Sequence, residues 1–319
     1  MLQTMKIGQF TLKIRALDDL HLPAYKGSTF RGGFGSSLRR VVCALRRQDC
    51  SGCLLRDRCV YVYVFETPPP QESKRLRLYK SVPHPFVIEP PLDETRLLAA
   101  GATLELGLVL MGQALEYLPY FIYAFMHLGE QGLGKGRGAF KLESVVSQES
   151  DGSKVIFRDE TGALTSPGGF PAQSFIQART AELQGMTRLR MIFLTPGRIK
   201  HADHLVEKPE FHHLVRALLR RLSSLSYFHG GEPLNLDFQG IIDAATHIHR
   251  VGAETRWYDW ERYSSRQKER MSLGGFVGTL EYEGDFTPFL PMLAWGEILH
   301  VGKGVSFGLG RYRLEQAGM

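Results

Sequence analysis

The feature that most constrains the fold is a glycine-rich, basic loop that occurs twice, at residues 129–138 and 302–312. Each loop follows an aromatic-rich segment that begins near a proline, Pro119 or Pro288, and each leads into a strand-like segment. We interpret this recurrence as an internal repeat, so that the chain consists of two related halves. Chance similarity of two glycine-rich loops is the alternative.

Hydrophobic periodicity gives both halves a similar order of elements. In the first half we predict helices at residues 28–47 and 116–128, and strands at 10–17, 60–65, 85–89, 103–111 and 140–146. In the second half we predict helices at residues 210–227 and 287–299, and strands at 189–194, 239–250 and 276–283. This order indicates an α+β chain of tandem ferredoxin-like domains with glycine-rich loops, at residues 1–180 and 181–319.

The glycine loops do not fit two common nucleotide-binding motifs. Residues 129–135 match the G-x4-G-K spacing of a P-loop, but Gly136 stands where that motif needs a serine or threonine for magnesium. A dinucleotide-binding fingerprint follows a strand and opens a helix, whereas each loop here follows a predicted helix. Two interpretations stay open: a backbone that approaches a phosphate chain closely, or a tight helix-to-strand connection that needs glycine.

The charge of the chain is basic. The net charge is +6, the isoelectric point is about 9.1, and arginine outnumbers lysine by about two to one. An arginine excess favours nucleic acid, because guanidinium groups bind phosphate in a bidentate manner and stack on bases, but an acidic partner or an ordinary soluble surface also fits. No apolar stretch is long enough to span a bilayer and no secretion signal is visible, so we expect a cytoplasmic protein that binds no membrane.

The four cysteines, Cys43, Cys50, Cys53 and Cys59, all lie within one short segment. A C-x2-C pair flanked by two further cysteines fits a tetrahedral thiolate site, which favours zinc. The outer spacings are irregular for a zinc ribbon, and an iron–sulfur cluster or free, redox-active thiols are the alternatives. Arginines around the cysteines would offset the thiolate charge or contact phosphate.

Three runs near the C-terminal end carry a resemblance to a known family. They are residues 273–278 (LGGFVG), 296–304 (GEILHVGKG) and 307–312 (FGLGRY). They closely resemble the precursor-crRNA-processing endoribonuclease family of the RAMP superfamily, the sixth CRISPR-associated protein family. Residues 25–35 (YKGSTFRGGFG), together with the cysteines, resemble the opening of one branch of that family. The resemblance is strong over roughly the last 60 residues, moderate over roughly the first 65, and weak between them.

The resemblance implies two ferredoxin-like (RRM-like) domains that bind CRISPR repeat RNA and cut precursor crRNA once per repeat without a metal cofactor. The ribose 2′-hydroxyl would attack the adjacent phosphate, leaving a 2′,3′-cyclic phosphate and a 5′-hydroxyl. Any zinc at the cysteines would then be structural. The alternative is a non-catalytic RAMP subunit that binds guide RNA in an effector complex, with other CRISPR effector subunits as partners.

The catalytic residues are harder to assign. In this family a histidine near the first helix is often the general base, but the predicted helix at residues 28–47 contains none. The candidates are His21, Tyr25 and Lys26, close to the start of that helix, and His300, at the mouth of the second glycine loop. For each histidine a structural or solvent-exposed role is the alternative.

The remaining candidates are expected to hold RNA. The segment at residues 256–267 interleaves arginines with aromatic residues, as phosphate contact and base stacking require, although its tryptophans packing in a core is an equal alternative. The full set expected to bind RNA is Arg31, Lys135, Arg137, Arg256, Trp257, Arg262, Arg266, Gly302, Lys303, Gly304, Gly308, Gly310 and Arg311. Histidine pairs at residues 201/204, 212/213 and 247/249 have no obvious third ligand, so we assign them no metal.

Overall fold

The computed structural model describes residues 2, 5–46, 49–69, 73, 82–167, 172–264 and 269–317. The chain folds into two compact units. The N-terminal unit comprises Thr4–Pro171 with Ser224–Glu232, and the C-terminal unit comprises Met1–Gln3, Ala172–Ser223 and Pro233–Met319. Within the described part of the chain, no helix is both long enough and apolar enough to cross a membrane.

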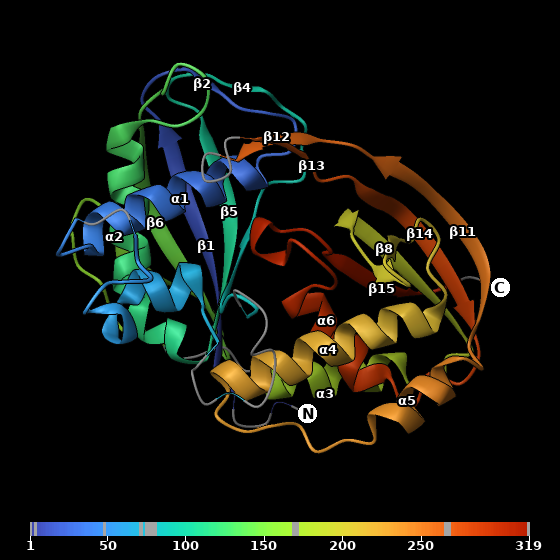
Figure 1. Ribbon diagram of the computed structural model, residues 1–319. Coiled ribbons are helices and arrows are strands. Elements are labelled where there is room, and N and C mark those ends of the chain that lie inside the picture. Colours follow the sequence, from blue (N-terminus) through green and yellow to red (C-terminus); the bar gives the residue numbers. More distant parts are fainter. Residues whose placement is uncertain are drawn as a thin grey trace. The chain divides into compact units, whose positions relative to one another are not determined.

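The N-terminal unit is built on an antiparallel five-stranded sheet in the order β3-β5-β1-β6-β7 (Figure 1). Its strands are β1 (Ile7–Ala16), β3 (Phe86–Glu89), β5 (Thr103–Met111), β6 (Phe140–Glu149) and β7 (Gly152–Arg158). Helix α1 (Gly27–Val42) lies between β1 and β3, and helix α2 (Leu118–Gln131) lies between β5 and β6. The series β1-α1-β3-β5-α2-β6 therefore has the β-α-β-β-α-β order, and the strand order, of a ferredoxin-like fold. Strand β7 extends the sheet at the edge.

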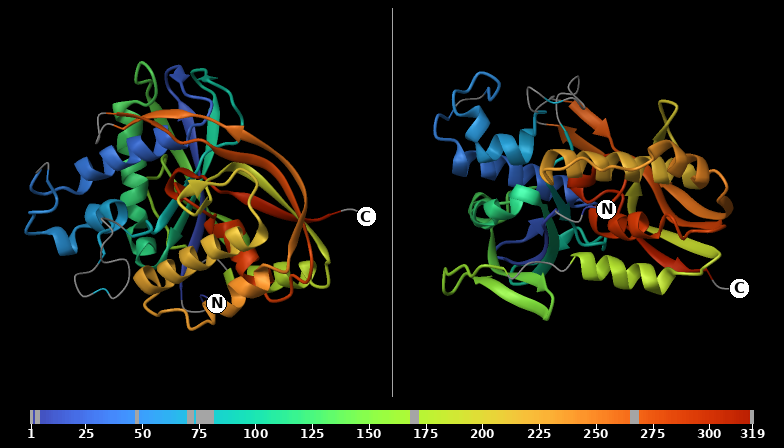
Figure 2. Two further views of the ribbon diagram at one scale, coloured as in Figure 1. Left: turned by 45° about the vertical axis from the view of Figure 1, so that its right-hand side comes forward. Right: turned by 90° about the horizontal axis from the view of Figure 1, so that it is seen from below.

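Helices α1 and α2 cover one face of this sheet (Figure 2). Aromatic side chains attach them to it. The ring of Phe34 on α1 lies 4.7 Å from that of Phe121 and 5.3 Å from that of Phe125, both on α2. The inward face of β1 joins the same core through alternating residues such as Phe10 and Leu12. Burial of large rings is the main favourable term in such a core, and it fixes the start of α1 relative to the sheet.

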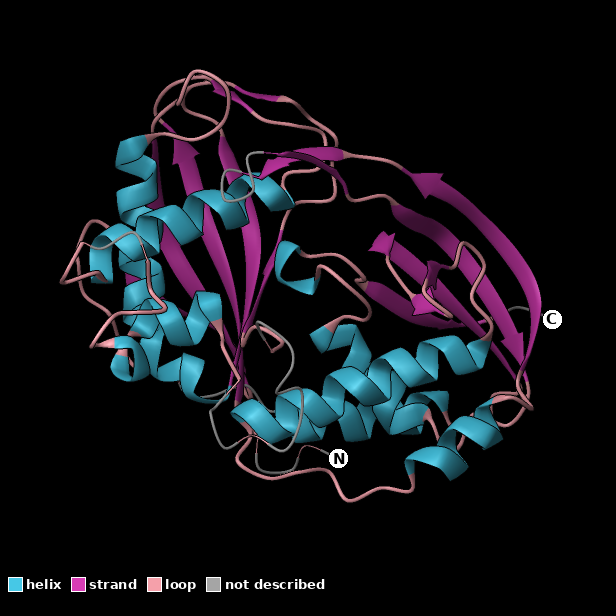
Figure 3. Ribbon diagram, in the orientation of Figure 1, coloured by secondary structure: helices cyan, strands magenta, loops and turns pink. Residues whose placement is uncertain are grey.

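The C-terminal unit repeats the plan (Figure 3). Its sheet has the order β11-β14-β8-β15, again antiparallel. The strands are β8 (Arg188–Gly197), β11 (His249–Tyr258), β14 (Gly275–Glu283) and β15 (Tyr312–Gln316), and the helices are α3 (Ala172–Leu183), α4 (Phe211–His229), α5 (Phe238–Ala245) and α6 (Leu290–Leu299). The sequence β8-α4-β11-β14-α6-β15 is a second ferredoxin-like arrangement, so the predicted tandem α+β fold is confirmed.

Both units also contain short strands and helical turns outside the main sheets. In the N-terminal unit they are β2 (Leu20–His21) paired with β4 (Leu97–Leu98), η1 (Arg56–Arg58), η2 (Val62–Glu66) and η3 (Gly112–Tyr117). In the C-terminal unit they are β9 (Lys200–His201) paired with β10 (His204–Leu205), β12 (Glu261–Ser264) paired with β13 (Glu269–Ser272), and η4 (Val305–Phe307).

Two predicted strands are wrong. Residues 60–65 form a helical turn that continues into the π-helix η2, although their β-branched and aromatic side chains favour a strand. Residues 239–250 begin as helix α5, which Asp237 caps by accepting a hydrogen bond from the Gly240 amide at 2.9 Å, and only then enter β11. The predicted helix at 28–47 also ends early, at Val42.

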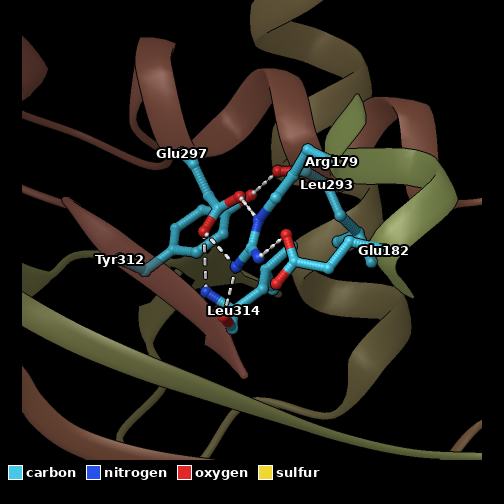
Figure 4. A network of polar contacts seen from close by, with 6 residues as sticks. All are labelled: Arg179, Glu182, Leu293, Glu297, Tyr312 and Leu314. Atoms are coloured by element: carbon cyan, nitrogen blue, oxygen red, sulfur yellow. Dashed lines mark hydrogen bonds and ion pairs between the residues drawn. The ribbon is translucent and has the colours of Figure 1, made fainter. Parts of the chain in front are cut away.

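A buried ion-pair network joins α3, α6 and β15 in the C-terminal unit (Figure 4). Arg179 donates from Nε to Glu297 at 2.8 Å and from Nη2 to its other carboxylate oxygen at 3.1 Å. That second oxygen also accepts from the Leu314 amide at 2.8 Å. Glu297 therefore anchors α6, the helix that leads into the second glycine loop.

Candidate nucleic-acid interface

A cavity of about 520 Å³ opens in the N-terminal unit where β2, the start of α1 and the first glycine loop meet. It is lined by His21, Leu22, Pro23, Thr29, Arg96, Gly134 and Lys135. The Lys135 amide donates to the carbonyl of His21 at 3.0 Å, which holds the loop against β2. Gly134 has φ +76°, and a Cβ there would lie 2.3 Å from the His21 carbonyl oxygen, so only glycine fits.

The charged lining residues of this cavity are accessible. The side chains of His21, Arg96 and Lys135 are exposed, and Thr29 belongs to the first turn of α1. Two cations and an imidazole thus surround a space beside a helix N-terminus, where the helix dipole favours an anion. The cavity can accept a phosphate group, and the imidazole of His21 is placed to exchange a proton with a bound ligand.

Lys26 and Tyr25 are close in sequence but differ from His21 in environment. Lys26 is 1% exposed, and its ammonium group donates to the Asp93 carbonyl oxygen at 2.6 Å and pairs with Asp93 Oδ1 at 3.3 Å. Burial raises the pKa of Asp93, but hydrogen bonds from Thr95 and the charge of Lys26 outweigh it, so this pKa lies below its usual value. Tyr25 is half-buried.

Arg31 and Arg137 occupy different positions in the N-terminal unit. Arg31, on α1, is half-buried, and its Cζ lies 3.9 Å from the centre of the Phe65 ring. Its Nη2 lies 3.1 Å from Nε2 of His84, a residue that no sequence motif marked. Arg137 is exposed at the tip of the first glycine loop, with φ +56°.

The second glycine loop is fixed by backbone contacts to the end of β8. The Lys303 amide donates to the Arg198 carbonyl at 3.0 Å, next to a bridge between Arg198 and Gly302. The Gly310 amide donates to Pro196, and a Cβ on Gly310, which has φ +71°, would lie 1.8 Å from the Val301 carbonyl oxygen. Lys303 itself is exposed.

Thr195, which sequence reasoning missed, holds the loop from inside. Its hydroxyl donates to the Gly308 carbonyl at 2.7 Å and accepts from the Arg311 amide at 2.9 Å. Gly304 and Gly308 flank the short helix η4 within the loop, both in the left-handed region. The loop is thus a rigid surface whose shape depends on glycine.

His300 lies inside this loop rather than at its surface. It is 0% exposed, and its Nδ1 lies 3.1 Å from the Leu309 carbonyl oxygen. It ends α6 with φ +61°, and Arg221 donates to the preceding carbonyl, that of Leu299, at 2.6 Å. In this structure its imidazole is therefore shielded from any ligand and shapes the loop.

The described part of the arginine–aromatic segment lies on the end of β11 and on β12. Arg256 is exposed, with its Cζ 5.6 Å from the ring centre of Tyr258. Trp257 is half-buried and donates from Nε1 to Asp259 at 2.8 Å. Arg262 lies on β12, opposite Met271, and Arg266 lies outside the described residues.

The zinc site expected at the cysteines is not confirmed. All four are free thiols and half-buried, and among the described residues no group of three or more His, Cys, Asp or Glu side chains could hold a metal ion. Burial raises the pKa of the Cys50 thiol. The C-x2-C spacing of Cys50 and Cys53 does not determine where Cys43 and Cys59 lie relative to that pair.

A histidine cluster in the C-terminal unit is the other feature that sequence reasoning missed. The ring of His201 on β9 lies 4.1 Å from that of His213 and 6.0 Å from that of His212, both on α4. Burial, with the neighbouring histidines, lowers the pKa of His213 to about 4. The pairs at 201/204 and 212/213 are separate in the sequence. The fold brings them together, because the β9–β10 pair holds His201 against α4.

Profiles of known protein families match parts of both halves of the chain. Residues 191–312 match the profile of the family described as CRISPR-associated endoribonuclease Cas6, and residues 5–168 match a profile described as an N-terminal domain. An uncharacterized protein of Archaeoglobus fulgidus is 27% identical over 301 residues, which cover 92% of this chain and 93% of that protein.

Solved structures share the fold at low identity. Thermus thermophilus Cas6 superposes with a TM-score of 0.55 at 14% identity, covering 98% of this chain and 99% of that one. A Cas6 product complex gives 0.55 at 16% identity, covering 97% and 100%. A partial Cas6-RT-Cas1–Cas2 complex gives 0.59 at 14% identity, and there this chain, 99% covered, spans only 47% of the other chain. The second glycine loop lies inside the part of the chain, residues 191–312, that matches the CRISPR-associated endoribonuclease Cas6 family, and the solved Cas6 structures show that the fold is shared.

Proposed function

We propose that this protein binds CRISPR repeat RNA and cleaves precursor crRNA once per repeat by attack of a ribose 2′-hydroxyl, without a catalytic metal. The observation that carries the proposal is the cavity of the N-terminal unit, where an exposed imidazole and two exposed cations, His21, Arg96 and Lys135, surround a space beside the α1 N-terminus. The match of residues 191–312 to an endoribonuclease family supports the same class of reaction.

The chemistry assigns a role to each group. The 2′-oxygen forms a bond to phosphorus while the bond from phosphorus to the 5′-oxygen breaks, which gives a 2′,3′-cyclic phosphate and a 5′-hydroxyl. His21 takes the proton of the 2′-hydroxyl, and a second proton must reach the leaving 5′-oxygen. Lys135 and Arg96 stabilise the charge that develops on the phosphate oxygens. Tyr25, at the same end of α1, is the further candidate for the second proton.

The C-terminal unit contributes the binding surface in this proposal. The second glycine loop, from Gly302 to Gly310, would follow the phosphate chain closely, with Lys303 and Arg311 adding charge. Arg256 and Trp257 on β11, with the β12 arginine Arg262, would contact bases and phosphates. Assembly with further CRISPR proteins is proposed by analogy with the Cas6-RT-Cas1–Cas2 complex.

The decisive experiment is incubation of the purified protein with the cognate repeat RNA in excess EDTA. We expect one cut per repeat that leaves a cyclic phosphate. A 2′-deoxy nucleotide at the cut site should abolish cleavage and leave binding intact, because it removes the nucleophile. Cleavage of the deoxy substrate, or dependence on added metal, would show that the proposed chemistry is wrong.

His21 is tested by substitution. The variant His21→Ala is expected to lower the single-turnover cleavage rate roughly 100- to 10,000-fold with little change in RNA affinity, because loss of a general base affects the transition state alone. His127→Ala is the matched control, because His127 lies on α2, is partly exposed, bonds Glu130 and does not line the cavity. If both substitutions lowered the cleavage rate equally, His21 would not be the general base.

A second candidate function is RNA binding without cleavage, in an effector complex. It is favoured by one observation: α1, Gly27–Val42, contains no histidine. Tight binding of an intact repeat RNA by the wild-type protein, with no cut after prolonged incubation, would select this function.

A further inference from the structure

A second polar cluster of the N-terminal unit lies against α1 and is centred on His84, in the segment before β3. His84 is held there on several sides. Its Nδ1 lies 2.7 Å from the hydroxyl of Thr67, and its Nε2 lies 3.1 Å from Nη2 of Arg31. Its ring also stacks against Phe65, with centroids 6.2 Å apart. None of these four residues lines the cavity beside His21.

The partners of His84 decide which ring nitrogen carries the proton. A guanidinium group can only donate, so Nε2 of His84 accepts from Arg31 and is unprotonated. Nδ1 then carries the proton and donates it to Thr67, whose hydroxyl donates in turn to the Val64 carbonyl at 3.2 Å. The imidazole is therefore neutral, in one tautomer, and acts as an acceptor for Arg31.

The backbone around His84 is held as firmly as its ring. The Val82 amide donates to the Thr67 carbonyl at 2.8 Å, and the Pro83 carbonyl accepts from Nε2 of His229 at 2.8 Å. Thr67 has φ +45°, in the left-handed region, and directly follows the π-helix η2. Both features are unfavourable in themselves and occur frequently at functional sites.

Arg31 gains a fixed orientation from this arrangement. Phe65 supports the face of its guanidinium group at 3.9 Å, while His84 binds one edge. Half-burial further restricts the side chain. A guanidinium group that is already ordered loses less conformational entropy on binding a phosphate than a flexible surface arginine does.

We propose that His84 is the positioning residue of Arg31, and that with Phe65 it presents the guanidinium group to a phosphate of the bound RNA. The inference rests on the proposed function and deepens it, because it adds a phosphate contact that is separate from the cavity. Phosphate is the fitting ligand, because its oxygens match the planar donor geometry of arginine. His84 acts only through Arg31 and does not touch the RNA.

The test is a double-mutant cycle on the affinity of the full-length protein for repeat RNA with a 2′-deoxy nucleotide at the cut site. The variants are Arg31→Ala, His84→Ala and the double variant. We expect each single variant to weaken binding roughly tenfold. The double variant should bind no more weakly than Arg31→Ala, because the two substitutions remove the same contact. In all three, the slope of log affinity against log salt should become shallower by about one.

A conservative variant separates positioning from simple loss of structure. The side-chain amide of His84→Gln can accept from Arg31 and donate to Thr67, so this variant should regain most of the lost affinity. Melting temperatures are measured in parallel. If His84→Ala does not fold, His84→Gln replaces it in the double-mutant cycle, both alone and combined with Arg31→Ala.

Two results would overturn the inference. The first concerns His84: either additive loss in a folded double variant or no rescue by His84→Gln would show that His84 acts independently of Arg31. The other is an unchanged affinity and salt slope in Arg31→Ala while Lys135→Ala still weakens binding, which would leave the proposed function standing. A wild-type protein that does not bind repeat RNA at all would instead refute the proposed function, and this inference with it.

Discussion

Lys26 and His300 are two ionisable residues that the fold places in its interior. Each was a catalytic candidate because of its position in sequence, beside a turn or a glycine loop. Lys26 is 1% exposed and bonds Asp93, and His300 is 0% exposed and contacts Leu309. His21, which has no distinguishing motif, is the candidate that faces an open cavity. At this scale, burial decides which group can meet a ligand.

Burial also sets the titration of His213. Desolvation, helped by His212 and His201, lowers the pKa of His213 in the folded protein to about 4, below the ordinary value of 6.5. The unfolded chain therefore takes up the proton first as the pH falls, so stability is full above about pH 6.5 and decreases towards pH 4. We expect the melting temperature of the wild type to decline over this range, and that of His213→Asn to decline less. His247→Asn, at an exposed position, should follow the wild type.

The pairing of Glu297 with Arg179 gives a prediction about stability. Both side chains are largely buried, at 11% and 15% exposure, and hydrogen bonds to Glu297 raise the pKa of Arg179 above its usual value. Glu297→Ala leaves a buried guanidinium group and the Leu314 amide without this acceptor, which should cost about 3–5 kcal/mol in denaturant unfolding. Glu182→Ala removes the exposed partner of the same arginine and should cost less than about 1 kcal/mol. Equal losses would contradict this account.

At the scale of single elements, helix α1 carries two glycines whose substitution should have opposite effects. A Cβ on Gly32 would meet nothing within 4 Å, so Gly32→Ala should stabilise the protein by about 0.5–1 kcal/mol through better helix propensity. A Cβ on Gly35 would lie 2.1 Å from the ring of Phe65. Gly35→Ala must therefore displace that ring and destabilise the fold.

The same pair of variants bears on the support of Arg31. Because Phe65 stacks on the guanidinium group, Gly35→Ala should also weaken RNA binding, whereas Gly32→Ala should not. Thermal unfolding and RNA titration of both proteins provide the measurement. If Gly35→Ala were as stable as the wild type, the packing of η2 against α1 would differ from that described.

The element predictions from sequence were accurate where hydrophobic periodicity was long and regular. Strands β1, β5 and β14 and helices α2 and α4 lie close to their predicted positions, because alternation and 3.6-residue repeats are local signals. The strand predicted at residues 60–65 failed. Six β-branched and aromatic residues fit a buried strand and a buried helical turn equally well, and packing against the core selected the π-helix.

At the scale of the whole molecule, net charge and duplication predict how RNA binding depends on salt. The chain carries a net charge of +6, and both ferredoxin-like units have a basic glycine loop. Affinity for repeat RNA should therefore fall linearly on a plot of log affinity against log salt. Lys135→Ala and Lys303→Ala, one from each loop, should each make the slope shallower by about one and should be additive. A slope that neither variant changes would show that the loops do not contact phosphate.

The sequence by itself determined the α+β class, the tandem order of elements and the two glycine loops, because periodicity and glycine act through neighbouring residues. Only the tertiary structure decided which distant side chains meet. Lys135 lies beside His21 because the first glycine loop pairs with β2, and Arg31 meets His84 because η2 and the segment before β3 pack against α1. Such contacts depend on strand register and turn geometry, which no local pattern encodes. The same reason explains why four clustered cysteines predicted a zinc site that the described residues do not confirm.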